Sequence, residues 1–98
     1  MNAQLEKLAA AGIDLVPSLA VPQYFVFTRD GFVSLVERKG DGFGAAGAPA
    51  LLTEHGLAML IWRGDQGFFV VKNHEQPATA AQIAALRRFA ADLAAALA

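Results

Sequence analysis

The sequence predicts an α+β protein with a four-stranded antiparallel sheet, built from two hairpins and flanked by a short N-terminal and a longer C-terminal helix. Three observations indicate this fold: two apolar, β-rich segments each contain a glycine turn, a capping signature precedes a C-terminal amphipathic segment, and the chain has 98 residues. That length suits one domain and is too short for two. We therefore expect a single compact domain over residues 1–98, with the order α-β-β-loop-β-β-α.

The first predicted element is a short helix over residues 3–11. Its apolar side chains recur at helical spacing, and Gly12 followed by apolar Ile13 is typical of a helix that ends at a glycine. A linker is expected between Pro17 and Pro22, because proline removes a backbone donor and biases the preceding residue away from helix.

The first hairpin is predicted over residues 24–37, around Asp30 and Gly31, a pair typical of a two-residue turn. We expect Arg29 to pair with Phe32, and this register assigns the apolar side chains to two faces. One face would carry Phe25, Phe27, Phe32 and Val36, and the other would carry Tyr24, Val26, Val33 and Leu35. Both faces of this hairpin are therefore apolar.

A second hairpin is predicted from strands over 57–63 and 68–74, joined by a turn over 64–67. Side chains alternate between faces along a strand, so two apolar sets cannot share one side. The sets are Leu60, Trp62, Phe69 and Val71, and Met59, Ile61, Phe68 and Val70. Neither face of this hairpin is polar either.

The last element is an amphipathic helix over residues 80–96. Thr79 and Gln82 have the spacing of a capping box at its start. An apolar stripe continues at steps of three and four residues through Ile83, Leu86, Ala90, Leu93 and Leu97. Arg87, Arg88 and Asp92 lie off this stripe, and we expect them to face solvent.

Between the hairpins, Gly42, Gly44 and Gly47 have the spacing G-x-G-x-x-G. A dinucleotide site requires this pattern between a strand and a crossover helix of a parallel unit, with an acidic residue after the next strand. Only residues 48–55 remain before the next strand, and no such acidic residue follows. We therefore interpret the glycine segment as a flexible connection between hairpins.

An alternative interpretation assigns a small-ligand or anion site to one end of the sheet. An antiparallel meander would bring the glycine segment, Arg38, His55 and His74 to that end. Backbone amides of Gly42 to Gly47 would bind the anion, either histidine would act as an acid or base, and Arg38 would pair with the charge. Two histidines fall short of a tetrahedral metal site, and no nucleophile is predicted, so no metal, cofactor or catalytic residue is assigned.

Composition narrows the remaining function classes. The net charge is −1, and the eight Lys and Arg residues are scattered, which disfavours binding to a nucleic acid. The chain has no cysteine, and no apolar run approaches the roughly 20 residues of a membrane helix. We expect a cytoplasmic protein that interacts with neither nucleic acid nor membrane.

The excess of apolar side chains on both sheet faces decides the leading hypothesis. Two helices cover one face, so the other face would stay exposed and would form a homodimer interface. The exposed set is either Tyr24, Val26, Val33 and Leu35, which we take as the candidate interface, or Phe25, Phe27, Phe32 and Val36. The chain would then be a homo-oligomeric interaction or adaptor module, with a second patch for a protein partner, rather than an enzyme. The competing arrangement is a three-layer monomer in which residues 15–21 fold back over that face and the helices lie on opposite sides.

Overall fold

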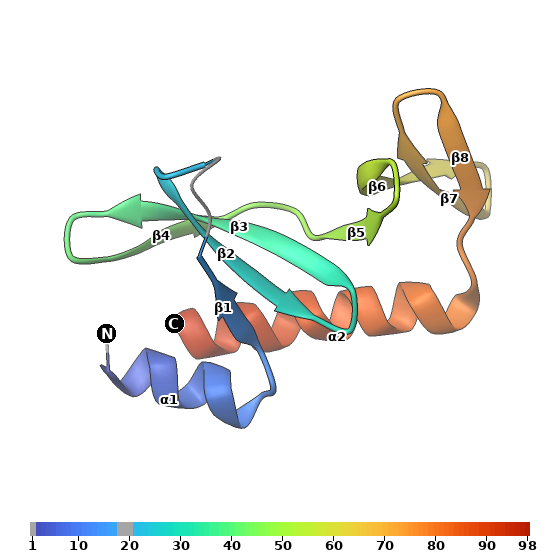
Figure 1. Cartoon of the computed structure of the whole chain (residues 1–98). Helices are drawn as coiled ribbons and strands as arrows, with labels where there is room; N and C mark the ends of the chain where they lie inside the picture. The colour runs from blue at the N-terminus through green and yellow to red at the C-terminus, as the bar shows by residue number, and fades with distance from the viewer. Residues whose placement is uncertain (1, 18–20) are drawn as a thin grey trace.

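The computed structural model describes residues 2–17 and 21–98, and these form two helices and eight strands (Figure 1). The helices are α1 (Asn2–Ala10) and α2 (Ala80–Leu97). The strands are β1 (Asp14–Val16), β2 (Tyr24–Arg29), β3 (Phe32–Lys39), β4 (Gly42–Ala46), β5 (Ala50–Thr53), β6 (Gly56–Arg63), β7 (Gln66–Val71) and β8 (His74–Pro77). The α+β class and both helices are confirmed, whereas the prediction of four strands is wrong.

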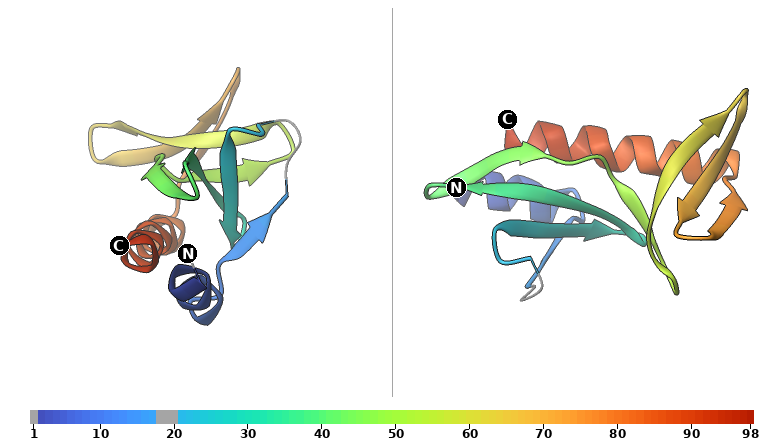
Figure 2. Two further views of the ribbon diagram at one scale, coloured as in Figure 1. Left: turned by 90° about the vertical axis from the view of Figure 1, so that its left-hand side faces the viewer. Right: turned by 90° about the horizontal axis from the view of Figure 1, so that it is seen from above.

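All strand pairs are antiparallel, and the sheet order is β1-β2-β3-β5-β6-β7-β8. Strand β3 has two partners along the same edge, because its first residues pair with β5 and its last residues pair with β4. The sheet curls like half a barrel, and both helices lie on one side of it (Figure 2). We call the side that faces the helices the inner face, and the opposite side the outer face.

The β2–β3 hairpin has the predicted register and turn. Arg29 pairs with Phe32, and Asp30 and Gly31 occupy the turn with φ angles of 53° and 85°. Positive φ at both central positions is what a type I′ turn requires, and Asp-Gly adopts it at low cost. The two apolar sets predicted for this hairpin therefore lie on opposite faces.

The glycine segment is a strand and not a flexible connection. Its residues Gly42 and Phe43 pair with Lys39 and Arg38 of β3, and the ladder shifts register before Val36 pairs with Ala46. Glycine and alanine have low β-propensity, so local preference gives no indication of a strand here. Pairing with the long, apolar β3 overrides that preference.

The second hairpin is confirmed over β6 and β7, but the predicted strand over 68–74 divides into two. It stops at Val71, turns through Lys72 and Asn73, and resumes at His74 as β8. Lys72 adopts a φ of 54°, which is uncommon for a residue other than glycine. The sequence analysis missed this β7–β8 turn because it contains no glycine.

The core lies between the inner face and the helices. Its sheet residues include Phe27, Phe32, Val36, Ala58 and Phe69, and its α2 residues include Leu86, Phe89 and Leu93. Both helices pack on this one face, so the three-layer monomer is not the observed arrangement (Figure 2). Strand β1 pairs with the edge of β2 instead of crossing the outer face, and residues 18–20 of the predicted covering segment lie outside the described residues.

The predicted caps are present at the end of α1 and at the start of α2. At the end of α1, the Ile13 amide donates to the Leu8 carbonyl at 2.9 Å, and Gly12 donates to Ala9 at 3.0 Å. These two bonds form a Schellman motif, which satisfies the last free carbonyls of the helix. At the start of α2, the Thr79 hydroxyl accepts from the Gln82 amide, and the Gln82 side chain accepts from the Thr79 amide.

One prediction about α2 needs correction, because Asp92 is not simply solvated. Its Oδ2 accepts a hydrogen bond from Arg29 Nη1 at 2.8 Å, and the same guanidinium donates to the Ala11 carbonyl at 2.9 Å. The Arg29 cation also lies 5.7 Å from the centre of the Phe89 ring. Arg29 therefore joins β2, the end of α1 and α2.

Candidate functional site

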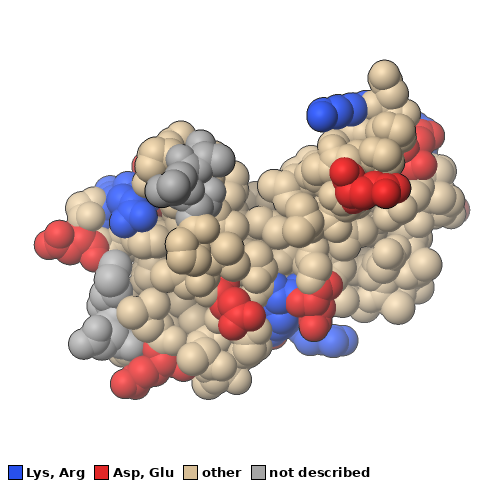
Figure 3. Space-filling model, in the orientation of Figure 1, with Lys and Arg blue, Asp and Glu red and all other residues tan. Residues whose placement is uncertain are grey.

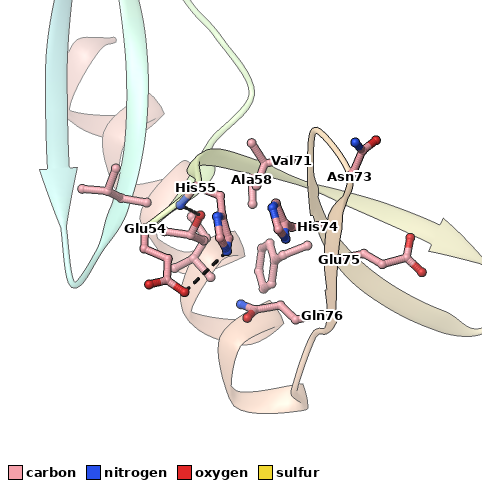
Figure 4. Close-up of a pocket in the computed structure, with 12 residues that line it drawn as sticks. Glu54, His55, Ala58, Val71, Asn73, His74, Glu75 and Gln76 are labelled. Atoms are coloured by element: carbon pink, nitrogen blue, oxygen red, sulfur yellow. Dashed lines mark hydrogen bonds and ion pairs between the residues drawn. The ribbon is translucent and has the colours of Figure 1, made fainter.

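A pocket of about 650 Å³ opens at the β5–β6 and β7–β8 turns (Figure 4). Its apolar lining includes Leu51, Ala58, Phe69 and Val71, which continue the inner face of the sheet. Its polar lining is Thr53, Glu54, His55, Asn73, His74, Glu75 and Gln76. The pocket therefore combines an apolar floor, continuous with the core, and a polar rim supplied by two turns.

The imidazole rings of His55 and His74 stack at the rim of this pocket. Their centroids lie 3.5 Å apart, and their planes are inclined by 5° (Figure 4). Thr53 holds the first turn, since its hydroxyl donates to the Gly56 carbonyl at 2.8 Å and accepts from the His55 amide at 3.2 Å. The second ring is placed by the pairing of His74 with Val71 across the β7–β8 turn.

Two carboxylates flank the histidines, and they differ in their partners. Glu75 accepts two hydrogen bonds of 2.7 Å from Arg63, and its side chain points away from the pocket (Figure 4). These hydrogen bonds hold the pKa of Glu75 below its ordinary value and raise the pKa of Arg63. Glu54 turns back toward the pocket, where its Oε1 lies 3.4 Å from His55 Nε2.

The stacked geometry does not form a metal site. A metal ion binds an imidazole nitrogen in the plane of the ring at about 2.0–2.1 Å, and the lone pairs of these two stacked rings lie in separate parallel planes 3.5 Å apart, so they do not converge on one ion. Over residues 2–17 and 21–98, no group of three or more His, Asp or Glu side chains could hold an ion. The histidine pair is better suited to hydrogen bonding and to stacking.

The structure separates the other predicted ligand residues from the histidines. Arg38, Gly42, Gly44 and Gly47 lie in or beside the β3–β4 hairpin, whereas β8 lies at the opposite end of the molecule (Figure 1). The Arg38 Nε donates to the Pro22 carbonyl at 3.2 Å, and its guanidinium lies 4.0 Å from the centre of the Phe25 ring. The Gly47 amide donates to the Leu35 carbonyl at 2.8 Å.

The outer face carries a patch of exposed apolar side chains on two adjacent strands. The residues are Leu52, Leu57, Met59 and Ile61, which are 59%, 38%, 40% and 44% exposed, and we call them the outer-face patch. Leu52 pairs directly with Leu57 across β5 and β6. Large apolar side chains that cluster on a surface mark interaction sites more often than scattered ones do.

The four residues predicted as an interface lie on the same face but are less exposed. Tyr24, Val26 and Leu35 are half-buried, and Val33 is only 6% exposed. Residues Met59 and Ile61 belong to an apolar set that the sequence analysis recognised, but Leu52 was missed because β5 was not predicted. The available signal for this strand was the short apolar run that ends in Leu51 and Leu52, directly before the turn at Thr53.

Charged groups are sparse on the surface shown in Figure 3. Lys, Arg, Asp and Glu side chains appear there in separate small groups, with broad uncharged areas between them. None of the described helices is both long enough and apolar enough to cross a membrane.

No family model matches this chain, and no curated protein or solved structure matches it significantly. The arguments about function therefore rest on the residues themselves.

Proposed function

We propose that the chain is a homo-oligomeric protein-interaction module that associates with a second copy through the outer-face patch. The observation that carries this proposal is the exposure of four large apolar side chains on the adjacent strands β5 and β6. A twofold axis would place the same patch of each copy against the other, which is the commonest symmetry of soluble oligomers. Face-to-face packing of two sheets would remove both patches from water.

The predicted strength of this association follows from the exposed fractions. The exposed fractions of the four patch residues add up to the equivalent of about 1.8 fully exposed side chains per copy. Burying a large apolar side chain contributes about 1.5–3 kcal/mol, so two copies would gain about 5–11 kcal/mol. Association costs about 4–15 kcal/mol, a range of the same order. We therefore expect a reversible, concentration-dependent dimer.

Neighbouring residues on the same face support this geometry. Phe68 and Val70 of β7 pair with Ile61 and Met59, and both are half-buried. Their partial exposure extends the apolar surface across a third strand. The predicted interface residues Tyr24, Val26 and Leu35 would contribute at the margin of the contact rather than at its centre.

The test is the oligomeric state measured by light scattering coupled to size exclusion. We expect the wild-type chain to be dimeric at about 100 µM, a concentration that populates complexes of micromolar affinity. Met59→Lys should yield a monomer, because it places a charge in the centre of the buried contact. Its matched control is Leu5→Lys on α1, where the side chain is 37% exposed and lies outside the patch.

Two results would contradict the proposal. A wild-type chain that stays monomeric throughout the concentration range would remove the dimer. A dimer that dissociates no more in Met59→Lys than in Leu5→Lys would show that the outer-face patch is not the interface.

A further inference from the structure

We propose that the pocket at the two turns binds a small organic cation, namely a primary amine attached to an aromatic or other apolar body. Its floor belongs to the inner face of the sheet, whereas the outer-face patch lies on the other face, and Leu52 of the patch also borders the pocket. The argument rests on the shape of the pocket, on the charge of its rim and on the direction of the polar side chains.

The shape fits a small molecule. A volume of about 650 Å³ lies within the usual range of ligand pockets, about 300–1,000 Å³. Ala58 and Phe69 on the floor are each 1% exposed and belong to the core, so the floor is held by the packing of the whole sheet. The small Ala58 side chain leaves room above the floor for an apolar body.

The charge of the rim selects a cation. The pocket lining contains two carboxylates, Glu54 and Glu75, and none of the described lining residues is Lys or Arg. The negative charge of Glu75 is compensated by the Arg63 guanidinium, which donates two hydrogen bonds to it. Among the described residues, Glu54 has His55 as its only ion-pair partner. An anionic head group at this rim would meet the Glu54 charge, while an ammonium group would be attracted to it.

The directions of the side chains assign a place to each part of the ligand. Glu54 bends toward His55, and Gln76 points toward the pocket, so both offer oxygen acceptors on the same side (Figure 4). An ammonium group has three donors and no acceptor, which matches this pair of acceptors. The apolar body would then lie over Ala58 and Phe69, beside the flat faces of the stacked imidazoles.

The experiment titrates the isotope-labelled 98-residue chain with 2-phenylethylamine and follows the backbone amides by NMR at neutral pH. The comparison ligand is 3-phenylpropionate, which has a similar apolar body and an anionic head. We expect saturable shifts at His55, Ala58, Phe69 and His74, with an affinity for the amine at least about tenfold above that for the carboxylate. No saturable shift up to about 10 mM of amine, or equal affinity for both ligands, would overturn the proposal.

Two charge-removing variants locate the amine. Glu54 has a side chain that is 86% exposed, so Glu54→Gln removes its charge without disturbing the core. We expect this variant to weaken amine binding by about three- to tenfold and to reduce the preference over the carboxylate. The control is Glu6→Gln on α1, which removes an exposed charge elsewhere and should leave both affinities unchanged. An equal loss in the two variants would show a general charge effect and would contradict the site.

The same titration on Met59→Lys separates this proposal from the dimer. Amine binding should persist in that variant with the wild-type affinity, since the pocket is formed within one copy of the chain. Loss of binding together with the dimer would place the ligand at the interface between copies and would refute a pocket contained in one copy.

Discussion

The rings of His55 and His74 stack with centroids 3.5 Å apart, although the residues are separated by two turns and two strands. This contact joins the β5–β6 turn to the β7–β8 turn at the rim of the pocket. It exists because β8 begins at His74 after a turn that brings the chain back beside β7. The stack therefore couples these two turns through a direct side-chain contact.

We expect this coupling to be measurable in a double-mutant cycle of His55→Ala and His74→Ala. Aromatic pairs contribute about 0.5–1.5 kcal/mol beyond their burial, so the two substitutions should be non-additive by about that amount. The measurement is the free energy of unfolding in urea. Combining His55→Ala with Leu5→Ala on α1 provides the control, for which we expect additive effects. Additivity in the histidine cycle would show that the stack contributes nothing to stability.

Arg29 and Asp92 provide a second prediction, because their ion pair joins the sheet to both helices. The Arg29 side chain is 15% exposed, and it donates to Asp92 and to the Ala11 carbonyl. Asp92→Ala leaves a largely buried cation with one partner fewer, so we expect the free energy of unfolding to fall by about 1–2 kcal/mol. Glu6→Ala, at an exposed site, should change it by less than about 0.5 kcal/mol. Equal effects of the two variants in urea denaturation would contradict this role.

Gly44 lies where β4 passes close to β3. A Cβ atom at this position would be 3.1 Å from Glu37 Cβ and 3.2 Å from the Glu37 carbonyl oxygen. Gly44→Val should therefore lower stability by about 1–3 kcal/mol through overpacking. The neighbouring exposed residue gives the control, since Ala45→Val introduces valine on the same strand at a position that already carries a Cβ atom, and it should cost little. Thermal unfolding of both variants tests this, and equal melting temperatures would argue against the close approach.

Glu75 should show a pH dependence set by Arg63. The Arg63 hydrogen bonds lower the pKa of Glu75, so the pair contributes to stability above the ordinary carboxyl pKa and loses that contribution as the pH falls through the lowered pKa. In Arg63→Met the Glu75 pKa should rise toward its ordinary value, which a carbon-detected NMR titration of the carboxyl group measures. Arg88→Met on α2 is the control and should leave the titration unchanged. An unchanged Glu75 midpoint in Arg63→Met would exclude the pair as its cause.

Part of the candidate site could be predicted from the sequence. His55 and His74 were assigned to one end of the sheet because an antiparallel meander places the start of the third predicted strand beside the end of the fourth, and the structure brings the two rings together. Arg38 and the three glycines were assigned to the same end, and the structure places them in the β3–β4 hairpin. The difference arises because β4 extends β3 into a protruding hairpin, a pairing with no signal in Gly-Ala-rich sequence.

The sequence by itself determined the elements whose signals are local. These elements are the Asp30-Gly31 turn, the register of Arg29 with Phe32, the Gly12 end of α1 and the Thr79 cap of α2. Each depends on a few adjacent residues, because its hydrogen bonds or φ angles involve only one turn of the chain. Tertiary structure alone decided that β4 and β5 share one edge of β3, that β8 returns beside β7, and which apolar side chains stay exposed. These features depend on backbone groups far apart in the chain, whose pairing is selected by the shape of the whole sheet and not by the preference of any single segment.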